Sequence, residues 1–358
     1  MKKNQLILGA LVLVALVALA LYEQHLHPFN WHMFLEEFKK ADRRKIGIGI
    51  GCIYLAYVFR SLRWAMLLRP NKKVQPLSLL GTQVIGFTAV ALIGRIADLV
   101  RPYLVARKTG LPLGSQIAVY IVERLFDAGS MALMFSSAIL LAPAGALPAP
   151  ELFRKWGYGG LVATLLGALF LAAVRMAGGV VASFLEGTFG LISKRLGHVV
   201  GHKVRTFRTG LDTLRTPADF AITLGLSLAM WGLITLAYFE GTQAFVPEPL
   251  RDSVTLAKCM VLMVGSGVAS IVQLPVIGWF TQIAAVAVAL RSLFNMVPET
   301  ATACAATLLL ITFLSIIPVG LIWAQFEHVN LRKVTVESEH AGEELTLQDD
   351  VEQAEPAS

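Results

Sequence analysis

The chain has 358 residues, of which 56% are hydrophobic and only 15% are charged, with a formal net charge of +7. A soluble chain usually carries about a quarter charged residues, so this composition argues against an ordinary soluble protein. Several apolar runs approach or exceed the ~18 residues that suggest a bilayer span, and their Leu- and Ala-rich, non-alternating pattern predicts helices rather than strands.

The N-terminal segment has a basic start followed by an apolar stretch over 6–21. This pattern also describes a secretory signal peptide, with a cleavage site at 18–20. We favour an uncleaved first span, because the apolar run is long and further spans follow. Phe34, Leu35 and Phe38 then recur at helical spacing in a polar segment, which predicts a helix lying at the membrane interface.

The remaining apolar runs cover about 46–68, 77–93, 115–141, 158–174, 218–240, 254–274, 279–294 and 300–325. Residues 334–358 differ, because they contain eight acidic residues and neither Lys nor Arg. They show no periodicity and predict a disordered acidic tail on the cytoplasmic side. We therefore expect an integral membrane domain over residues 1–333.

Loop charges predict the orientation, because Lys and Arg concentrate on the cytoplasmic side of membrane proteins. The 175–217 loop carries seven basic residues against two acidic ones and should be cytoplasmic, together with both termini. The basic groups at 69–73 and 95–108 lie on the same side only if 77–107 is a re-entrant hairpin, which we favour over a full crossing. The basic cluster at 39–45 does not fit this scheme, because it would lie on the non-cytoplasmic side of the membrane.

A weak internal repeat supports the hairpin. Residues 254–294 show the same order of apolar run, break and second helical piece as residues 77–107. Two halves, about 1–145 and 155–333, would each contain three full spans, so the second half would be inverted, as in many transporters. The predicted fold is an all-α polytopic bundle with about six spans and two re-entrant hairpins, or with eight spans. The alternative is that the chain has no internal repeat and that its breaks are the Gly- and Pro-containing interruptions found in many membrane helices.

Charged residues lie within or at the ends of these apolar runs. They are Arg60, Arg63, Arg95, Asp98, Arg101, Glu123, Arg124 and Asp127. At ~2.5–3.5 kcal/mol each, six unpaired charges at the bilayer centre would cost roughly 15 kcal/mol. The charges of the six residues from Arg95 to Asp127 sum to zero, so these residues can pair with one another. Arg60 and Arg63 add a surplus of two positive charges. Such a surplus suits one anionic phosphate, which arginine binds through paired hydrogen bonds. The alternative is a structural role in pinning helices, with snorkelling of the first two arginines.

The stretch GRIADLVRPYLVARKTGLPLGSQIAVYIVERLFD, residues 94–127, resembles the signature of the lysylphosphatidylglycerol synthase transmembrane-region family, also called the flippase-like domain family. RSLRWAMLLRP upstream and QLPVIGWFTQIAAVAVAL downstream extend the resemblance to about 45–325. The positions that match directly are Gly94, Arg95, Arg101, Pro102, Glu123, Arg124 and Asp127. The departures are Ile93 for Pro, Ala97 for Gly, Asp98 for Glu and Gln282 for an acidic residue.

The resemblance implies translocation of an anionic lipid or lipid-linked intermediate in the cytoplasmic (inner) membrane of a bacterium or archaeon. A phospholipid or polyprenyl-phosphate headgroup would bind the eight charged residues named above together with Gln282. The alternative is an accessory membrane partner of a glycosyltransferase or lipid synthase.

An enzyme is the less favoured class. His198 and His202 are spaced as metal ligands can be, but no carboxylate completes a known motif. Some family members carry a soluble aminoacyl-transferase domain, for which the 25-residue tail leaves no room. The three cysteines are isolated in apolar runs. We expect no catalytic residue, metal, cofactor or nucleic-acid partner.

Overall fold

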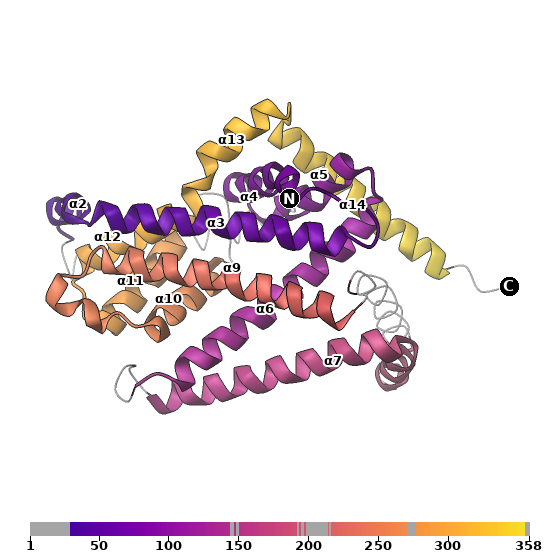
Figure 1. Cartoon of the computed structure of the whole chain (residues 1–358), viewed down its shortest axis with the longest axis horizontal. Coiled ribbons are helices and arrows are strands. Elements are labelled where there is room, and N and C mark those ends of the chain that lie inside the picture. Colours follow the sequence, from indigo (N-terminus) through magenta and orange to yellow (C-terminus); the bar gives the residue numbers. More distant parts are fainter. Residues whose placement is uncertain are drawn as a thin grey trace.

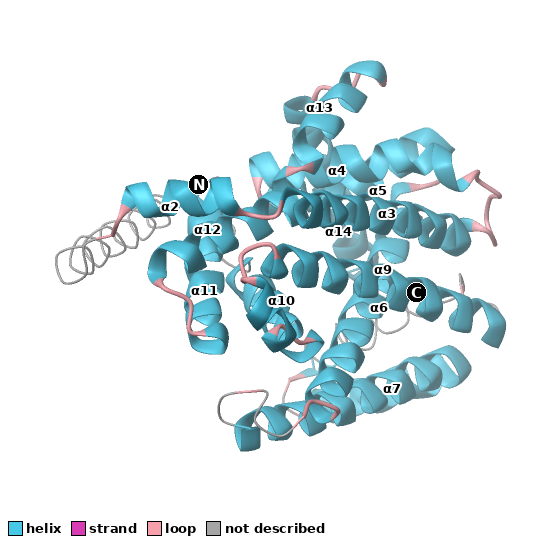
Figure 2. Cartoon of the chain, turned by 60° about the vertical axis from the view of Figure 1, so that its left-hand side comes forward, coloured by secondary structure: helices cyan, strands magenta, loops and turns pink. Residues whose placement is uncertain are grey.

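The computed structural model describes residues 29–143, 147, 150–191, 193, 194, 197, 214, 216–270 and 277–354, and all regular structure in them is helical (Figures 1 and 2). The α-helices are α2 (Trp31–Lys40), α3 (Arg43–Leu68), α4 (Leu80–Ile93), α5 (Val100–Thr109), α6 (Leu113–Leu140), α7 (Pro150–Gly190), α9 (Pro217–Gln243), α10 (Leu256–Ala269), α11 (Ile277–Phe294), α12 (Pro298–Leu309), α13 (Ile316–Phe326) and α14 (Leu331–Ala354). The shorter elements are the 3-10 helices η1 (Pro76–Leu79), η2 (Arg95–Leu99) and η3 (Glu248–Ser253) and the π-helix η5 (Leu310–Leu314). The predicted all-α class is confirmed.

Five helical segments among the described residues are long and apolar enough to cross a membrane. They are Arg43–Leu68, Pro76–Ile93, Pro150–Ala177, Pro217–Gln243 and Pro298–Phe326. Helix α6 has 28 residues, enough for a span, but three charged residues lie in its middle. The expected first span over 6–21 lies outside the described residues. A multi-pass membrane bundle is therefore the architecture of this chain.

Helices α3 and α9 lie side by side in opposite directions (Figure 1). At one end the Asp42 backbone N–H donates to the Ala244 carbonyl at 3.1 Å. Toward the other end Arg63 Nη1 donates to Ser227 Oγ at 2.8 Å. Each helix therefore starts where the other ends. Corresponding spans of two inverted halves must have this antiparallel relation.

The segment from η1 to α5 folds back on itself as a helical hairpin. Gly94 ends α4 with a φ of 92°, in the region that favours glycine. After the turn, α5 returns along α4 until Lys72 Nζ donates to the Thr109 carbonyl at 2.6 Å. The chain thus leaves this first hairpin close to where it entered. The arrangement brings the 69–73 loop close to the last turn of α5, which carries Arg107 and Lys108, whereas Arg95 follows the turn at the other end of the hairpin. A re-entrant path through the membrane stays a prediction.

Helices α10 and α11 form a second hairpin. Lys258 Nζ, near the start of α10, lies 4.8 Å from the centre of the Phe294 ring at the end of α11. The expected break at 274–275 lies outside the described residues. Element η3, which leads into this hairpin, contacts the start of α3 through Arg251, whose Nη2 lies 3.3 Å from Asp42 Oδ2. The first hairpin instead follows the end of α3, so the two hairpins begin at opposite ends of this helix.

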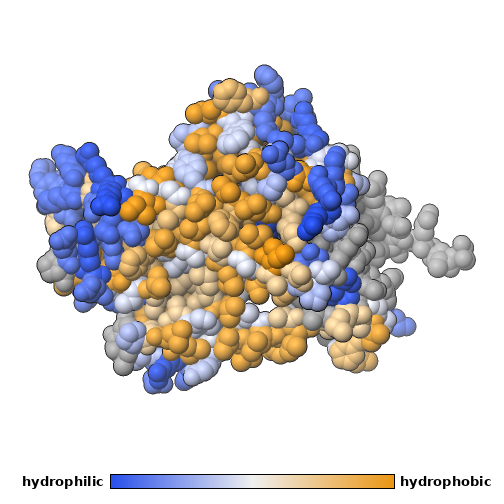
Figure 3. Space-filling view, viewed as in Figure 1, coloured by the Kyte–Doolittle hydropathy of each residue, from blue (hydrophilic) through white to orange (hydrophobic). Residues whose placement is uncertain are grey.

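Hydrophilic side chains gather at the α2 end of the molecule and at the opposite side, with a broad apolar band between them (Figure 3). At the α2 end the basic cluster of 39–45 has acidic neighbours. Lys45 Nζ lies 2.9 Å from Glu240 Oε2, and Lys40 Nζ lies 3.5 Å from Glu36 Oε2. These pairs reduce the net positive charge of the one group that conflicts with the predicted orientation.

Helix α2 has the amphipathic character expected of an interfacial helix. Asn30 caps it by accepting a hydrogen bond from the Met33 N–H at 3.0 Å. Trp31 and Leu35 are 63% and 56% exposed, whereas Phe38 packs edge-on against Phe245 at 6.2 Å. The predicted helix is confirmed, and its exposed tryptophan suits a membrane–water interface.

The expectation of a disordered tail over 334–358 is wrong for most of that segment. Helix α14 extends from Leu331 to Ala354. Leu331, Val334, Thr335 and Ser338 recur at helical spacing, and Val334 is 2% exposed within a cluster of apolar side chains from the first hairpin. Tyr103 Oη donates to Glu337 Oε2 at 3.1 Å. One narrow face of uncharged residues, of which Leu331 and Val334 are apolar, therefore packs against the first hairpin and orders the helix through tertiary contacts.

Candidate functional site

Three helices meet around a set of charged side chains, all buried except that of Arg124, that we term the arginine cluster. Its members are Arg60 and Arg63 on α3, Arg101 on α5, and Glu123, Arg124 and Asp127 on α6. They come from three separate stretches of the chain, and the paired residues Arg63 and Asp127 are 64 positions apart. The first hairpin brings them together, because its return arm carries Arg101 between α3 and α6.

Arg63 is the centre of the cluster and is only 1% exposed. Its Nη2 donates to Glu123 Oε1 at 2.7 Å and its Nη1 donates to Asp127 Oδ1 at 2.6 Å. These carboxylates are four residues apart on α6 and thus lie one turn above the other. The two arms of the guanidinium therefore bind both carboxylates at once. Snorkelling of Arg63 to the interface, the alternative drawn from its place near a span end, is wrong.

Arg101 is 2% exposed and joins the hairpin to the same carboxylate. Its Nη1 lies 3.2 Å from Glu123 Oε2 and donates to Gln83 Oε1 at 3.1 Å. The sequence left open whether Arg95 or Arg101 of the hairpin would pair with Glu123 or Asp127 of the following span, and the structure pairs Arg101 with Glu123. Aromatic rings surround the guanidinium, with centroids 4.4, 5.1 and 5.5 Å from Cζ, and they belong to Phe87, Tyr120 and Trp64. This cage adds cation–π attraction to the ion pair.

Arg60 differs from its neighbours. It is 8% exposed, and its guanidinium lies 4.3 Å from the centre of the Phe87 ring and 5.8 Å from that of Tyr57. Among the described residues, the carboxylates of Glu123 and Asp127 pair with other arginines and not with Arg60. Phe87 thus has two guanidiniums near its ring, of which only one has an anionic partner.

The cluster has an excess of positive charge. Four arginines contribute four positive charges and two carboxylates contribute two negative charges, which leaves +2. Two amide donors beside it, Gln83 Nε2 and Gln116 Nε2, and two donors within it, Arg63 Nε and Arg124 Nε, are buried without a hydrogen-bond acceptor among the described residues. Arg124 Nη2 and Asp127 Oδ2 also lack a well-aligned hydrogen bond and contact each other only as an ion pair, at 3.0 Å. Buried donors of this kind cost about 1–3 kcal/mol each unless an acceptor reaches them. Charge and donors together match an oxygen-rich anion.

Arg124 connects the cluster to the exterior. Its Nη2 lies 3.0 Å from Asp127 Oδ2, while its side chain is 41% exposed. Asp98 on the hairpin is close enough to interact electrostatically with Arg124. The side chain of Arg95 lies outside the described part of the structure.

Gln282 occupies a different element from the other predicted site residues. It lies on α11 in the second hairpin, where its Nε2 donates to Ser266 Oγ at 2.5 Å. Ser266 is itself 3% exposed. A substrate site shared by Gln282 and the arginine cluster stays a prediction.

The sequence did not single out the uncharged partners of the cluster. Tyr120 could have been found, because it precedes Glu123 and Arg124 by three and four residues and so shares their helical face. Ser227 could not, because it is one of many small polar residues in α9 and only tertiary packing places its hydroxyl beside Arg63.

The site is closed in this conformation. Of the arginines expected to bind a headgroup, Arg60, Arg63 and Arg101 are each at most 8% exposed, so no open cavity exposes these three side chains. In the described part of the chain, no group of three or more His, Cys, Asp or Glu residues is placed to hold a metal ion. His198 and His202 lie outside that part.

Comparison with known protein families matches residues 6–320 to the lysylphosphatidylglycerol synthase TM region. No curated protein and no solved structure gives a significant match to this chain. The matched range contains the arginine cluster and both hairpins and ends within α13.

Proposed function

The chain belongs to the lysylphosphatidylglycerol synthase TM region family, and from this premise we propose that it moves an anionic lipid or lipid-linked intermediate across the inner membrane. The phosphate of the headgroup binds at the arginine cluster while the acyl or prenyl chains stay in lipid. The observation that carries the proposal is the surplus of two positive charges in the arginine cluster, with Arg60 buried and unpaired among the described residues.

The chemistry of the cluster favours a phosphate ligand. A polyprenyl phosphate is a phosphate monoester and carries about −1.5 to −2 charges near neutral pH, which is close to the surplus of the cluster. The phosphate diester of a phospholipid such as phosphatidylglycerol carries one negative charge and would neutralise about half of that surplus. The Arg60 guanidinium presents a planar fork that can donate two parallel hydrogen bonds to phosphate oxygens. The carboxylates of Glu123 and Asp127 hold Arg63 in place, with Nη–O distances of 2.7 and 2.6 Å. Their role is to orient the arginines, and no chemical step is part of the proposal.

The two hairpins supply the moving parts. They begin at opposite ends of α3, and each lies beside a full-length helix of its own half. In the proposed cycle both pack as re-entrant hairpins, and the first moves away from α3 to admit the headgroup. Transporters with inverted repeats and broken helices bind substrate near the midplane and rock one element against another. The loop charges support cytoplasmic N- and C-termini.

Reconstitution of the purified full chain into liposomes tests this function. Translocation of a fluorescent phosphatidylglycerol is followed by quenching of the label in the outer leaflet. We expect faster loss of fluorescence than in protein-free liposomes. Arg60→Gln should abolish the acceleration and Arg60→Lys should retain part of it, because lysine keeps the charge but lacks the fork.

Arg44→Gln is the matched control, because this arginine is on the same helix and is exposed at its start. It should leave translocation unchanged. If the wild-type chain retains the lipid but accelerates nothing, translocation is refuted. An accessory role beside a lipid- or glycan-synthesising enzyme then becomes the better account.

A further inference from the structure

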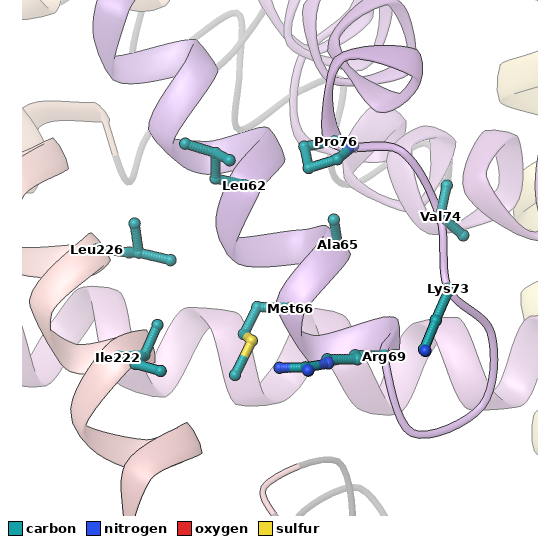
Figure 4. A pocket seen from close by; sticks show the side chains of 9 residues that line it. All are labelled: Leu62, Ala65, Met66, Arg69, Lys73, Val74, Pro76, Ile222 and Leu226. Carbon is teal, nitrogen blue, oxygen red and sulfur yellow. The ribbon is translucent and has the colours of Figure 1, made fainter.

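A groove of about 430 Å³ lies between α3 and α9 on the outside of the bundle (Figure 4). The α3 residues that line it are Leu62, Ala65, Met66 and Arg69, at helical spacing along one face. Ile222 and Leu226 on α9 face them across the groove. The volume falls within the range of about 300–1,000 Å³ typical of ligand sites.

One end of the groove is basic and the rest is apolar. Arg69 is the residue that follows α3, and Lys73 lies in the loop that leads to the first hairpin. Both are exposed, and among the described residues no carboxylate forms an ion pair with either. Neighbouring Lys72 is already engaged with the Thr109 carbonyl at 2.6 Å. Arg69 and Lys73 therefore lie at the basic end of an otherwise apolar groove.

The position of the groove in the membrane defines what can enter it. Both α3 and α9 are long and apolar enough to cross a bilayer, so the groove between them faces acyl chains. From Arg69 to Leu62 the seven-residue separation corresponds to about 10 Å along the helix axis, at ~1.5 Å per residue. The basic end of the groove lies at the end of the span, where headgroup phosphates are found.

We propose that this groove is a docking site for one anionic glycerophospholipid, with an acyl chain along Leu62, Met66 and Leu226 and the headgroup phosphate between Arg69 and Lys73. The occupant follows from charge complementarity, since two cations without a carboxylate partner in the described part of the chain border an otherwise apolar surface. A zwitterionic lipid binds less tightly, because its own ammonium group offsets the phosphate.

The docking site is separate from the arginine cluster. The hydrogen bond of Arg63 Nη1 to Ser227 Oγ, at 2.8 Å, joins α3 to α9 one residue beyond Leu62 and Leu226. This contact separates the groove from the buried charges. The proposal is therefore independent of lipid translocation, and each can fail without the other.

Photolabelling combined with native mass spectrometry of the full chain tests the site. The probe is phosphatidylglycerol with a photoactivatable group on one acyl chain, compared with phosphatidylcholine carrying the same chains. We expect labelling of groove residues on α3 and α9 by the anionic probe. Arg69→Gln with Lys73→Gln should weaken retention of phosphatidylglycerol by about thirtyfold, taking about 1 kcal/mol for each cation at the membrane surface.

Two controls make the result specific. Arg43→Gln with Arg44→Gln removes two cations from the opposite end of α3, and retention should change by less than about twofold, below 0.5 kcal/mol. Arg60→Gln should leave labelling of the groove unchanged. Leu226→Trp fills the groove and should reduce labelling even though both cations remain.

Three outcomes overturn the proposal. One is equal loss of phosphatidylglycerol in the Arg69/Lys73 and Arg43/Arg44 double variants, which would reflect general charge attraction. Another is equal retention of the two lipids by the wild-type chain. The third is labelling spread over the exposed apolar surface of α7 without enrichment in the groove.

Discussion

Replacement of Glu123 by Gln tests whether the arginine cluster is held together by its central carboxylate. The substitution keeps the shape of the side chain but removes the negative charge that Arg63 contacts at 2.7 Å and Arg101 at 3.2 Å. Removing one partner of a buried ion pair costs about 3–5 kcal/mol, because a buried charge is left uncompensated. At about 2 °C per kcal/mol for a chain of this size, the melting temperature should fall by about 6–10 °C.

The measurement is thermal unfolding of the purified chain in detergent, with two comparisons. Glu36→Gln removes a carboxylate that is 44% exposed and lies 3.5 Å from Lys40. An exposed pair contributes less than about 1 kcal/mol, so this variant should melt within about 2 °C of wild type. Adding Arg101→Gln to Glu123→Gln restores the charge balance and should recover part of the loss. Equal melting of the Glu123 and Glu36 variants, or strictly additive losses in the double variant, would refute the pairing.

The other predictions concern topology, packing and the C-terminal helix. Single cysteines at Asn71 and Leu111, in a chain whose three native cysteines are buried, should be labelled from the same side of the membrane, and opposite-side labelling excludes a re-entrant first hairpin. Gly86→Ala should lower the melting temperature by several degrees, because the added Cβ collides with the aliphatic part of the Arg101 side chain. Gly47→Ala, whose added Cβ meets open space, is the control, and equal melting temperatures of the two variants would contradict this packing. Val334→Asp places a charge at a site only 2% exposed and should release α14, measured as faster amide hydrogen exchange over residues 331–342; unchanged exchange would show that the helix does not depend on this contact.

The sequence alone predicted the spans closely. The expected runs at 46–68 and 218–240 correspond to α3 over 43–68 and α9 over 217–243. This agreement has a simple cause, because a lipid-exposed span needs a continuous apolar run and its length is set by the bilayer. The turn of the first hairpin was also readable from the sequence, because the apolar run stops at a glycine, Gly94, and a second helical piece follows.

The pairing of Arg101 with Glu123 was predictable for a related reason. A charge buried in a membrane protein requires a partner, and few opposite charges were available in the neighbouring apolar runs. Local spacing placed Glu123 and Asp127 on one helical face. Charge balance and helical spacing together thus narrowed the choice of partners to a few residues.

Only the tertiary structure decided which arginine lies at the centre. Arg63 is near the end of its span in the sequence, yet packing of α3 against α6 and α9 buries it with Ser227 as a third partner. The helical structure of α14 could likewise not be predicted from the sequence. Its few apolar residues stabilise the helix only because the first hairpin supplies a surface against which Val334 packs. Hydropathy and spacing describe one segment at a time, whereas these contacts join segments more than a hundred residues apart, and only the folded bundle brings them within reach.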